Sequence, residues 1–256
     1  MTMQTMLANP LASIVLMHAD DLLMLGHVQS DWTGLAPILE EDIAASSMAQ
    51  DDLSHALVLY QYLAEEFDLD PDAIAFDRDP ADYRCCNLTT VPDEFDWAVS
   101  MCKRWLLSTY TKLGLDRLAL VDEGDLGDRC ARLRDESAIH VAHLGAWMIR
   151  LGTGSTESNE RMQAALNLLA EEAGMMFEPP DLGFESDEGF CCGRGEMFDE
   201  WATLVGATLS EAGLQASFTL PDQAARGGRR GEHAGHFSEQ HAEMTEVRRA
   251  EPATAW

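Results

Sequence analysis

Basic residues are scarce in this sequence. Lysine and arginine together number 17 of 256 residues, against 45 aspartates and glutamates, which gives a formal charge of −28 at pH 7. A surface of that sign repels phosphate groups, so it argues against nucleic acids and anionic membranes as partners. We therefore expect an acidic protein with no nucleic-acid and no membrane partner.

Long apolar runs and paired-cysteine motifs are also scarce. The apolar stretch at residues 11–17 is short and has no basic leader, unlike a secretory signal. No segment approaches the roughly 20 apolar residues expected of a bilayer span. The six cysteines include the adjacent pairs Cys85-Cys86 and Cys191-Cys192 but no C-x-x-C pair, so neither a zinc ribbon nor a disulfide framework is indicated. A cytoplasmic location fits best.

Strand-like alternation is absent over any useful length, whereas apolar residues recur at helical spacing. The expected helices cover about residues 10–30, 37–67, 92–120, 126–151, 155–177, 197–212 and 236–249. Asp93 and Glu94 are expected in the first turn of the third long helix, and Ser155 or Thr156 at the cap of the fifth. The acidic, Gly/Pro-rich stretch 178–196 is expected to be a loop.

The order of these helices indicates the fold. Two pairs of long helices, with a long connection between the second and third, is the order found in ferritin-like bundles. We expect an all-α fold, a ferritin-like four-helix bundle over about residues 10–152 with additional C-terminal helices over about 155–250. The whole chain, residues 1–256, is expected to be a single domain.

The stretch DESAIHVAH (135–143) carries ionisable groups on a helix face that is otherwise apolar. Glu136, His140 and His143 fall on one side of the helix, because residues three and four apart are neighbours. The second long helix repeats the theme with Asp52 and His55. This constellation could be a metal site or a buried hydrogen-bonded network.

Comparison with a di-iron ligand set favours the network. Ferritin-like carboxylate proteins take one Glu from each of two helices and a Glu-x-x-His pair from each of the other two. Asp20 on the first helix could contribute, but Glu136 and His140 are one residue too far apart for the standard pair. The third helix has no acidic residue between Ala98 and Leu115. We therefore expect no metal site, no cofactor site and no catalytic residue in this chain.

Four blocks of sequence then carry a specific resemblance. They are LEEDIAASSMAQDDLSHAL (39–57), AFDRDPADYRCCNL (75–88), DESAIHVAHLGAWMIRLGTGSTES (135–158) and GGRRGEHAGHFSEQHAEM (227–244). In order and separation they resemble the PaaC family, the C subunits of the ring 1,2-phenylacetyl-CoA epoxidase (phenylacetate-CoA oxygenase). The resemblance covers about residues 11–256.

The resemblance implies a structural, non-catalytic subunit of a multicomponent monooxygenase in phenylacetate degradation. A homologous subunit with a di-iron centre would epoxidise the aromatic ring of phenylacetyl-CoA with O2. Electrons would come from NADPH through a reductase that carries FAD and an iron–sulfur cluster. The expected partners are thus the di-iron subunit and the other epoxidase subunits, in a hetero-oligomer.

The sequence departs from the family pattern at two places. His55 and Leu57 stand where the family has Gln and Arg, and Leu106 where the third helix usually carries Asp. On this interpretation Asp20, Asp52, His55, Glu136, His140 and His143 are vestiges of a metal site. The alternatives are a divergent di-iron oxidase using four of them, and a scaffold subunit for another acyl-CoA oxygenase.

The C-terminal block offers one more candidate. Arg229 and Arg230 form a basic pair near a helix start, where a CoA phosphate or an acidic partner could dock. We favour a loop that only positions the last helix. His233, His236 and His241 are expected to be surface or capping residues.

Overall fold

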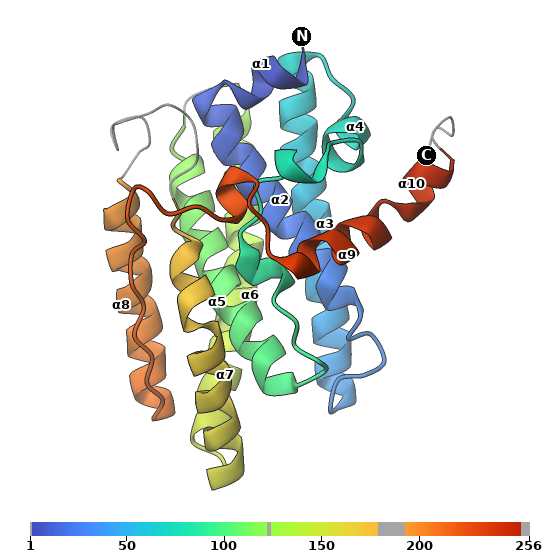
Figure 1. Cartoon of the computed structure of the whole chain (residues 1–256). Helices are drawn as coiled ribbons and strands as arrows, with labels where there is room; N and C mark the ends of the chain where they lie inside the picture. Colours follow the sequence, from blue (N-terminus) through green and yellow to red (C-terminus); the bar gives the residue numbers. More distant parts are fainter. Residues whose placement is uncertain (1, 122–123, 179–192, 252–256) are drawn as a thin grey trace.

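The computed structural model describes residues 2–121, 124–178 and 193–251, and within these ranges it contains helices and loops but no strand (Figure 1). The α-helices are α1 (Met3–Leu7), α2 (Pro10–Ser30), α3 (Leu39–Phe67), α4 (Pro71–Phe76), α5 (Trp97–Leu118), α6 (Leu126–Gly152), α7 (Thr156–Met175), α8 (Arg194–Ala212), α9 (Gly235–Met244) and α10 (Glu246–Ala250). The short 3-10 helices are η1 (Pro80–Asp82), η2 (Asn87–Thr90) and η4 (Gly228–Arg230).

Two helical hairpins form the bundle. α2 packs along α3, and α5 packs along α6, each pair joined by a short loop (Figure 1). The long connection between the hairpins, residues 68–96, holds α4, η1 and η2. This is the expected helix order, so the all-α, ferritin-like fold class is confirmed.

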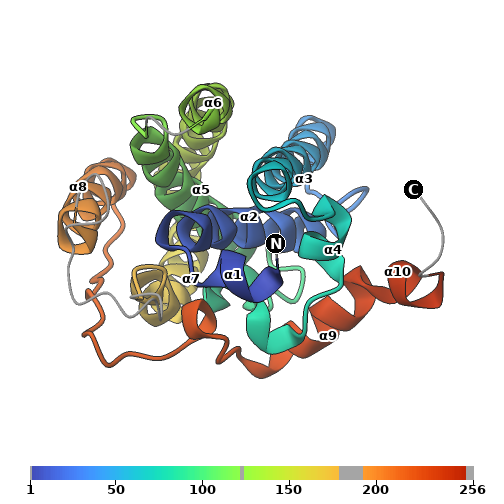
Figure 2. The ribbon, with the colours of Figure 1, turned by 90° about the horizontal axis from the view of Figure 1, so that it is seen from above.

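The remaining helices cover selected sides of the bundle. α7 packs against α5, α8 packs against α6, and the C-terminal segment returns so that α9 reaches η2 and α2. Seen from above, α3 and α6 lie on one side of α2 and α5, whereas α7 and α9 lie on the other (Figure 2). α7 and α9 therefore cover one side of the bundle and leave α3 at its opposite edge, whereas α6 is flanked by α8.

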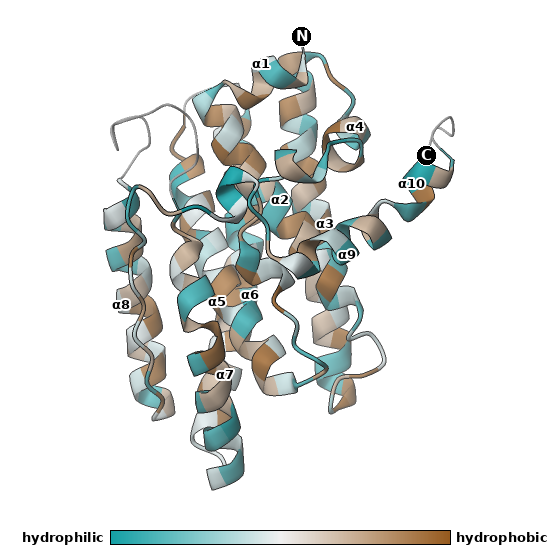
Figure 3. Ribbon diagram, in the orientation of Figure 1, coloured by the Kyte–Doolittle hydropathy of each residue, from teal (hydrophilic) through white to brown (hydrophobic). Residues whose placement is uncertain are grey.

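α5 is the central helix. Nearly all of its residues are buried, including Trp105, whose side chain packs among residues of α6, α7 and α8. The outer helices instead alternate polar and apolar residues along their length, as expected for helices with one buried face (Figure 3). Burial of α5 places Lys103, Arg104 and Arg117 inside the protein, where each needs a partner.

The start of α5 differs from the expectation. Glu94 and Phe95 have φ values of 47° and 56°, in the left-handed region, so they cannot belong to the first turn. The helix begins at Trp97, and Asp96 caps it by accepting a hydrogen bond from the Ala98 amide. Asp93 is used elsewhere, since its carboxylate accepts a hydrogen bond from the Trp32 indole at 2.9 Å.

The other helix bounds agree with the sequence within a few residues. Ser155 caps α7 in a capping box, as one of the two expected caps. α8 begins at Arg194 rather than 197, and the expected helix at 236–249 is two helices that meet at Thr245. Most of the expected loop at 178–196, with Cys191 and Cys192, lies outside the described residues. The cysteines within them are free and buried.

One expectation about apolar segments was wrong. α2 is long and apolar enough to cross a membrane by length and composition, with a mean hydropathy of 1.4 over its most apolar window. That window is 78% buried inside the bundle, which is typical of a core helix. The helix also carries His18, Asp20 and Asp21 among its buried residues.

Asp20 and Asp21 connect distant segments of the chain to α2. Asp20 accepts hydrogen bonds from Arg78, at 2.9 Å from Nη1, and from the Tyr60 hydroxyl at 2.6 Å. Asp21 forms a bidentate pair with Arg229, at 2.9 and 2.7 Å. Both aspartates and both arginines are buried, so these ion pairs hold the long connection and the C-terminal segment against the bundle.

α2 and α5 approach each other closely at Gly114. A Cβ atom there would lie 2.1 Å from Cε1 of His18, which is itself buried beside Tyr110. We predict that Gly114→Ala lowers the free energy of unfolding by about 1–3 kcal/mol, because the buried ring has no room to move. Gly206→Ala is the control: nothing lies within 4 Å of a Cβ there, so the helix should gain roughly 0.5–1 kcal/mol. Urea denaturation measures both, and a Gly114→Ala protein as stable as wild type would contradict the close approach.

His18 also predicts a pH dependence of stability. Burial, and then the nearby Arg229, lower the pKa of His18 to about 3. The unfolded chain binds this proton near pH 6.5, so stability is lost as the pH falls below that value. We predict that wild type loses up to about 1.4 kcal/mol per pH unit more than His18→Gln between roughly pH 6 and 4.

Urea denaturation at several pH values gives both slopes. His236→Gln, at an exposed position of α9, is the control and should keep the wild-type slope. Parallel slopes for wild type and His18→Gln would show that the buried imidazole does not couple to folding.

Candidate functional site

Histidine–carboxylate pairs join α3 to α6 across the bundle. His55 Nε2 lies 2.7 Å from Glu136 Oε2, and His140 Nε2 lies 3.0 Å from Asp51 Oδ2. The rings of His55 and His140 are nearly parallel, with centroids 6.3 Å apart. The structure thus brings together residues that the sequence placed on two separate helices.

A third pair extends this row toward one end of α3. His143 Nε2 lies 3.1 Å from Glu41 Oε2. Glu41 is buried, whereas His143 is about one-third exposed (34%). We call these three pairs, together with Asp52 and Arg104, the α3–α6 polar layer.

Arg104 of α5 is the central cation of the layer. Its Nη2 donates a hydrogen bond to Asp52 Oδ2 at 2.6 Å, and both side chains are buried. Its Nε and Nη1 have no hydrogen-bond partner among the described residues, nor does Nδ1 of His55. Unpartnered buried donors of this kind are commonly satisfied by internal water.

Burial shapes the protonation of this layer. It raises the pKa of Asp52, against the opposing effect of Arg104, and it lowers the pKa of His140 despite the nearby Asp52 and Asp51 carboxylates. It also lowers the pKa of Arg104 from its ordinary value. The layer is therefore an ion pair surrounded by hydrogen-bonded histidines, of which His140 is neutral at pH 7.

Two of the candidate residues are less buried than a network inside the bundle requires. The Glu136 side chain is 59% exposed and His143 lies at the rim, so of the candidates on α3 and α6 the buried ones are Asp52, His55 and His140. A third candidate, Asp20, makes its hydrogen bonds outside the layer, with the long connection and α3. Helical spacing therefore grouped Glu136, His140 and His143 correctly on one face of α6. That face is more exposed than we expected.

Arg104 is the residue that sequence reasoning missed. The sequence shows Arg104 as one of three charged residues between Ala98 and Leu115, with Lys103 as another possible partner for the carboxylates. Lys103 points away: its Nζ donates to the Val91 carbonyl and lies 3.7 Å from Asp93. A signal was present, because a basic residue on the buried face of a helix needs a polar partner inside the protein, and Asp52 was a candidate.

These residues do not fit a di-iron centre. A permanently charged guanidinium is bonded to Asp52, so this carboxylate faces a cation instead of an open coordination position. α5 contributes this cation where a ferritin-like ligand set needs a carboxylate. Within the described residues, no three His, Cys, Asp or Glu side chains are grouped closely enough to hold a metal ion.

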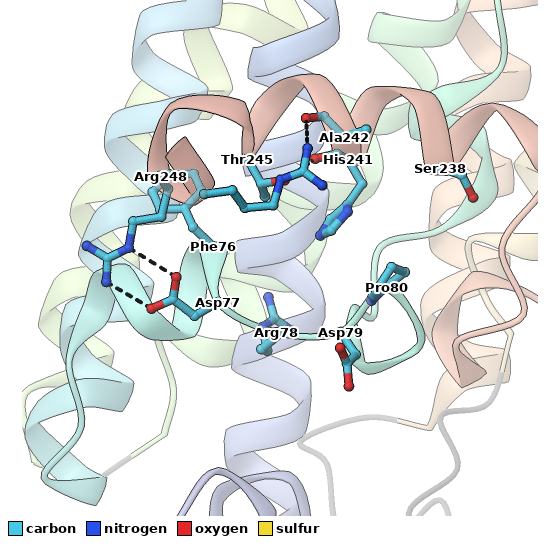
Figure 4. Close-up of a pocket in the computed structure, with 11 residues that line it drawn as sticks. Phe76, Asp77, Arg78, Asp79, Pro80, Ser238, His241, Ala242, Thr245 and Arg248 are labelled. Atoms are coloured by element: carbon cyan, nitrogen blue, oxygen red, sulfur yellow. Dashed lines mark hydrogen bonds and ion pairs between the residues drawn. The ribbon is translucent and has the colours of Figure 1, made fainter. Parts of the chain in front are cut away.

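A cavity of about 570 Å3 lies between α4 and the C-terminal helices (Figure 4). The positive groups around it are engaged: Arg248 pairs with Asp77 at 2.8 Å, and Arg78 with Asp20. His241, which lines the cavity, is buried between Tyr83 and Phe237. The expectation of a surface position was therefore wrong for His241.

The basic pair at η4 does not form a docking site either. Arg229 is fully buried against Asp21, and the Gly227 amide donates to Glu178 Oε1 at 2.6 Å. These contacts agree with the favoured interpretation, a loop that positions the last helices. His233 stacks on Phe237 with ring centroids 3.8 Å apart.

The Arg104–Asp52 pair predicts a specific pattern of stability changes. Arg104→Met leaves Asp52 buried without its cation, so we expect the free energy of unfolding to fall by about 3–5 kcal/mol. Asp52→Leu combined with Arg104→Met removes both charges and should recover most of that loss. The control Arg132→Met changes an exposed arginine of α6 and should stay within about 0.5 kcal/mol of wild type. Urea denaturation that showed Arg104→Met and the double variant equally destabilised would argue against the pair.

Comparison with known proteins now gives the family. Residues 1–256 match the family described as phenylacetic acid catabolic protein. A curated relative is the C subunit of the 1,2-phenylacetyl-CoA epoxidase of Escherichia coli (strain K12), which is 28% identical over 251 residues, or 97% of this chain and 100% of that protein. Because the family match spans the whole sequence, the chain belongs to the phenylacetic acid catabolic protein family.

Proposed function

We propose that this chain is a structural subunit of a multicomponent monooxygenase that epoxidises the aromatic ring of phenylacetyl-CoA. The similarity to an epoxidase C subunit over nearly the full length of both proteins supports the substrate. The oxygen chemistry belongs to a di-iron site in a homologous partner subunit. A reductase with FAD and an iron–sulfur cluster supplies the electrons from NADPH, and the complex works in the cytoplasm.

One observation carries the structural role: the buried guanidinium of Arg104 on Asp52. In ferritin-like oxidases the metal ions link the helices of the bundle through their carboxylate ligands. Here a hydrogen-bonded cation makes that link between α5 and α3 without any capacity for redox chemistry. His55 and His140 complete the link from α3 to α6 through Glu136 and Asp51.

The alternatives make different demands on these residues. A divergent di-iron oxidase would use Asp52, His55, Glu136 and His140 as ligands, and Arg104 would then have to leave Asp52. A scaffold subunit for another acyl-CoA oxygenase would keep the same structure and differ in the substrate of its partner. The polar layer favours a scaffold over an oxidase, and the similarity to the epoxidase subunit favours phenylacetyl-CoA.

Iron content tests the proposal. We predict well below one iron per purified chain, because the cation on Asp52 opposes binding of Fe2+. The measurement is elemental analysis after expression in iron-replete medium, with the co-expressed di-iron subunit as the positive control. About two irons per chain, the complement of a ferritin-like oxidase, together with an oxo-bridge absorption band, would make this chain an oxidase.

A further inference from the structure

Several of the few basic residues lie inside the protein rather than on its surface. All 17 lysines and arginines belong to the described residues, and the buried ones are Arg78, Lys103, Arg104, Arg117 and Arg229. Three of them are the partners of the buried aspartates of α2 and α3. The carboxylates on the surface are therefore left with even fewer cations around them.

The surface carries mostly negative side chains. Exposed carboxylates occur on each of the outer helices α3, α6, α7, α8 and α9, for example Glu65, Glu66, Asp128, Glu160, Glu171, Asp199, Glu211 and Glu239. The exposed basic residues are Arg132, Arg150, Arg161, Arg226 and Arg249. Two of these arginines each pair with a single carboxylate, at Asp96 and Glu232. Most of the exposed carboxylates thus have other carboxylates as their nearest charged neighbours.

Some carboxylates crowd one another across the folded structure. Burial, and then the Glu243 carboxylate, raise the pKa of Asp31 against the opposing effect of His27. Asp31 follows the end of α2 whereas Glu243 lies on α9, so folding brings these like charges together. Burial and two neighbouring glutamates also raise the pKa of Glu172 on α7. Repulsion of this kind is absent in an extended chain and therefore opposes the compact state.

Salt acts differently on the repulsive and the attractive contacts. The Debye length is about 10 Å at 0.1 M salt and about 3 Å at 1 M. Neighbouring side chains on a helix surface are roughly 5–6 Å apart, so their repulsion persists at 0.1 M and is screened at 1 M. The main attractions, such as Arg229 with Asp21 at 2.7 Å, are buried and are screened much less. Salt therefore removes mostly repulsion from this protein.

We propose that the stable fold of this chain requires molar ionic strength, because monovalent salt must screen the carboxylates of its surface. The effect comes from the surface charge as a whole and needs no individual cation site. The medium in which the protein works is accordingly rich in salt. The proposal is independent of the proposed function, since the same surface would need the same screening in any role.

Thermal unfolding of the full-length chain tests the proposal. Circular dichroism follows the unfolding midpoint in KCl at 0.1, 0.5, 1 and 3 M. We expect the midpoint to rise by at least ~10 °C between 0.1 and 1 M, with most of the rise complete at 1 M, where the Debye length is already short. A chain that is unfolded at 0.1 M and folded at 1 M would support the proposal equally.

A charge-reversal variant tests whether the carboxylates are the cause. It combines Glu66→Lys, Glu171→Lys, Glu211→Lys and Glu239→Lys, at exposed positions of α3, α7, α8 and α9. This variant should be more stable than wild type at 0.1 M KCl, and its midpoint should rise by at least ~5 °C less up to 1 M. The matched control changes the same four residues to Asp, which keeps their charge and should keep the wild-type rise within about 2 °C.

Other effects of salt give different results. Since screening depends on ionic strength alone, tetramethylammonium chloride should reproduce the rise given by KCl at equal concentration. A rise with KCl only would indicate a specific cation site and overturn the proposal. An equal rise in wild type and the lysine variant would indicate exclusion of salt from the surface and would also overturn it. So would a wild-type midpoint that changes by less than about 2 °C.

Discussion

Two adjacent carboxylates in the middle of α2 hold this protein together. Asp20 and Asp21 are both buried, so each needs a cation from another part of the chain. Arg78 comes from the connection between the two hairpins, and Arg229 comes from a segment 208 residues further along. The bundle therefore does not merely carry its long connection and C-terminal segment; it depends on them to neutralise its own core.

The same principle explains the polar layer between α3, α5 and α6. Asp52 is paired with Arg104, and the histidines use the carboxylates of the facing helix. Buried ion pairs add little net stability compared with apolar packing, but removing one partner is costly. Their value here is positional, because they fix the rotation of α3 relative to α5 and α6.

The sequence predicts more of the fold than of the layer. Helical periodicity places α2, α3 and α6, and a local cap places Ser155 at the start of α7, because these signals are contained within a few residues. The start of α5 was not predicted, since no sequence pattern marks the left-handed backbone at Glu94 and Phe95, where Phe95 packs against the distant Trp32. The role of Arg104 could not be predicted for a similar reason. Its partner Asp52 lies 52 residues away, and no local sequence pattern encodes that pairing.

The separation of Asp21 from Arg229 has a consequence for synthesis. During translation α2 emerges from the ribosome well before its neutralising arginine, which lies 208 residues further along the chain. Until then Asp21 keeps its hydration only if α2 stays at least partly open to water. The hairpins can form early, but Asp21 gains its cation only when the segment that carries Arg229 packs against α2. A chain that stops before residue 229 lacks the cation with which Asp21 pairs in the folded bundle.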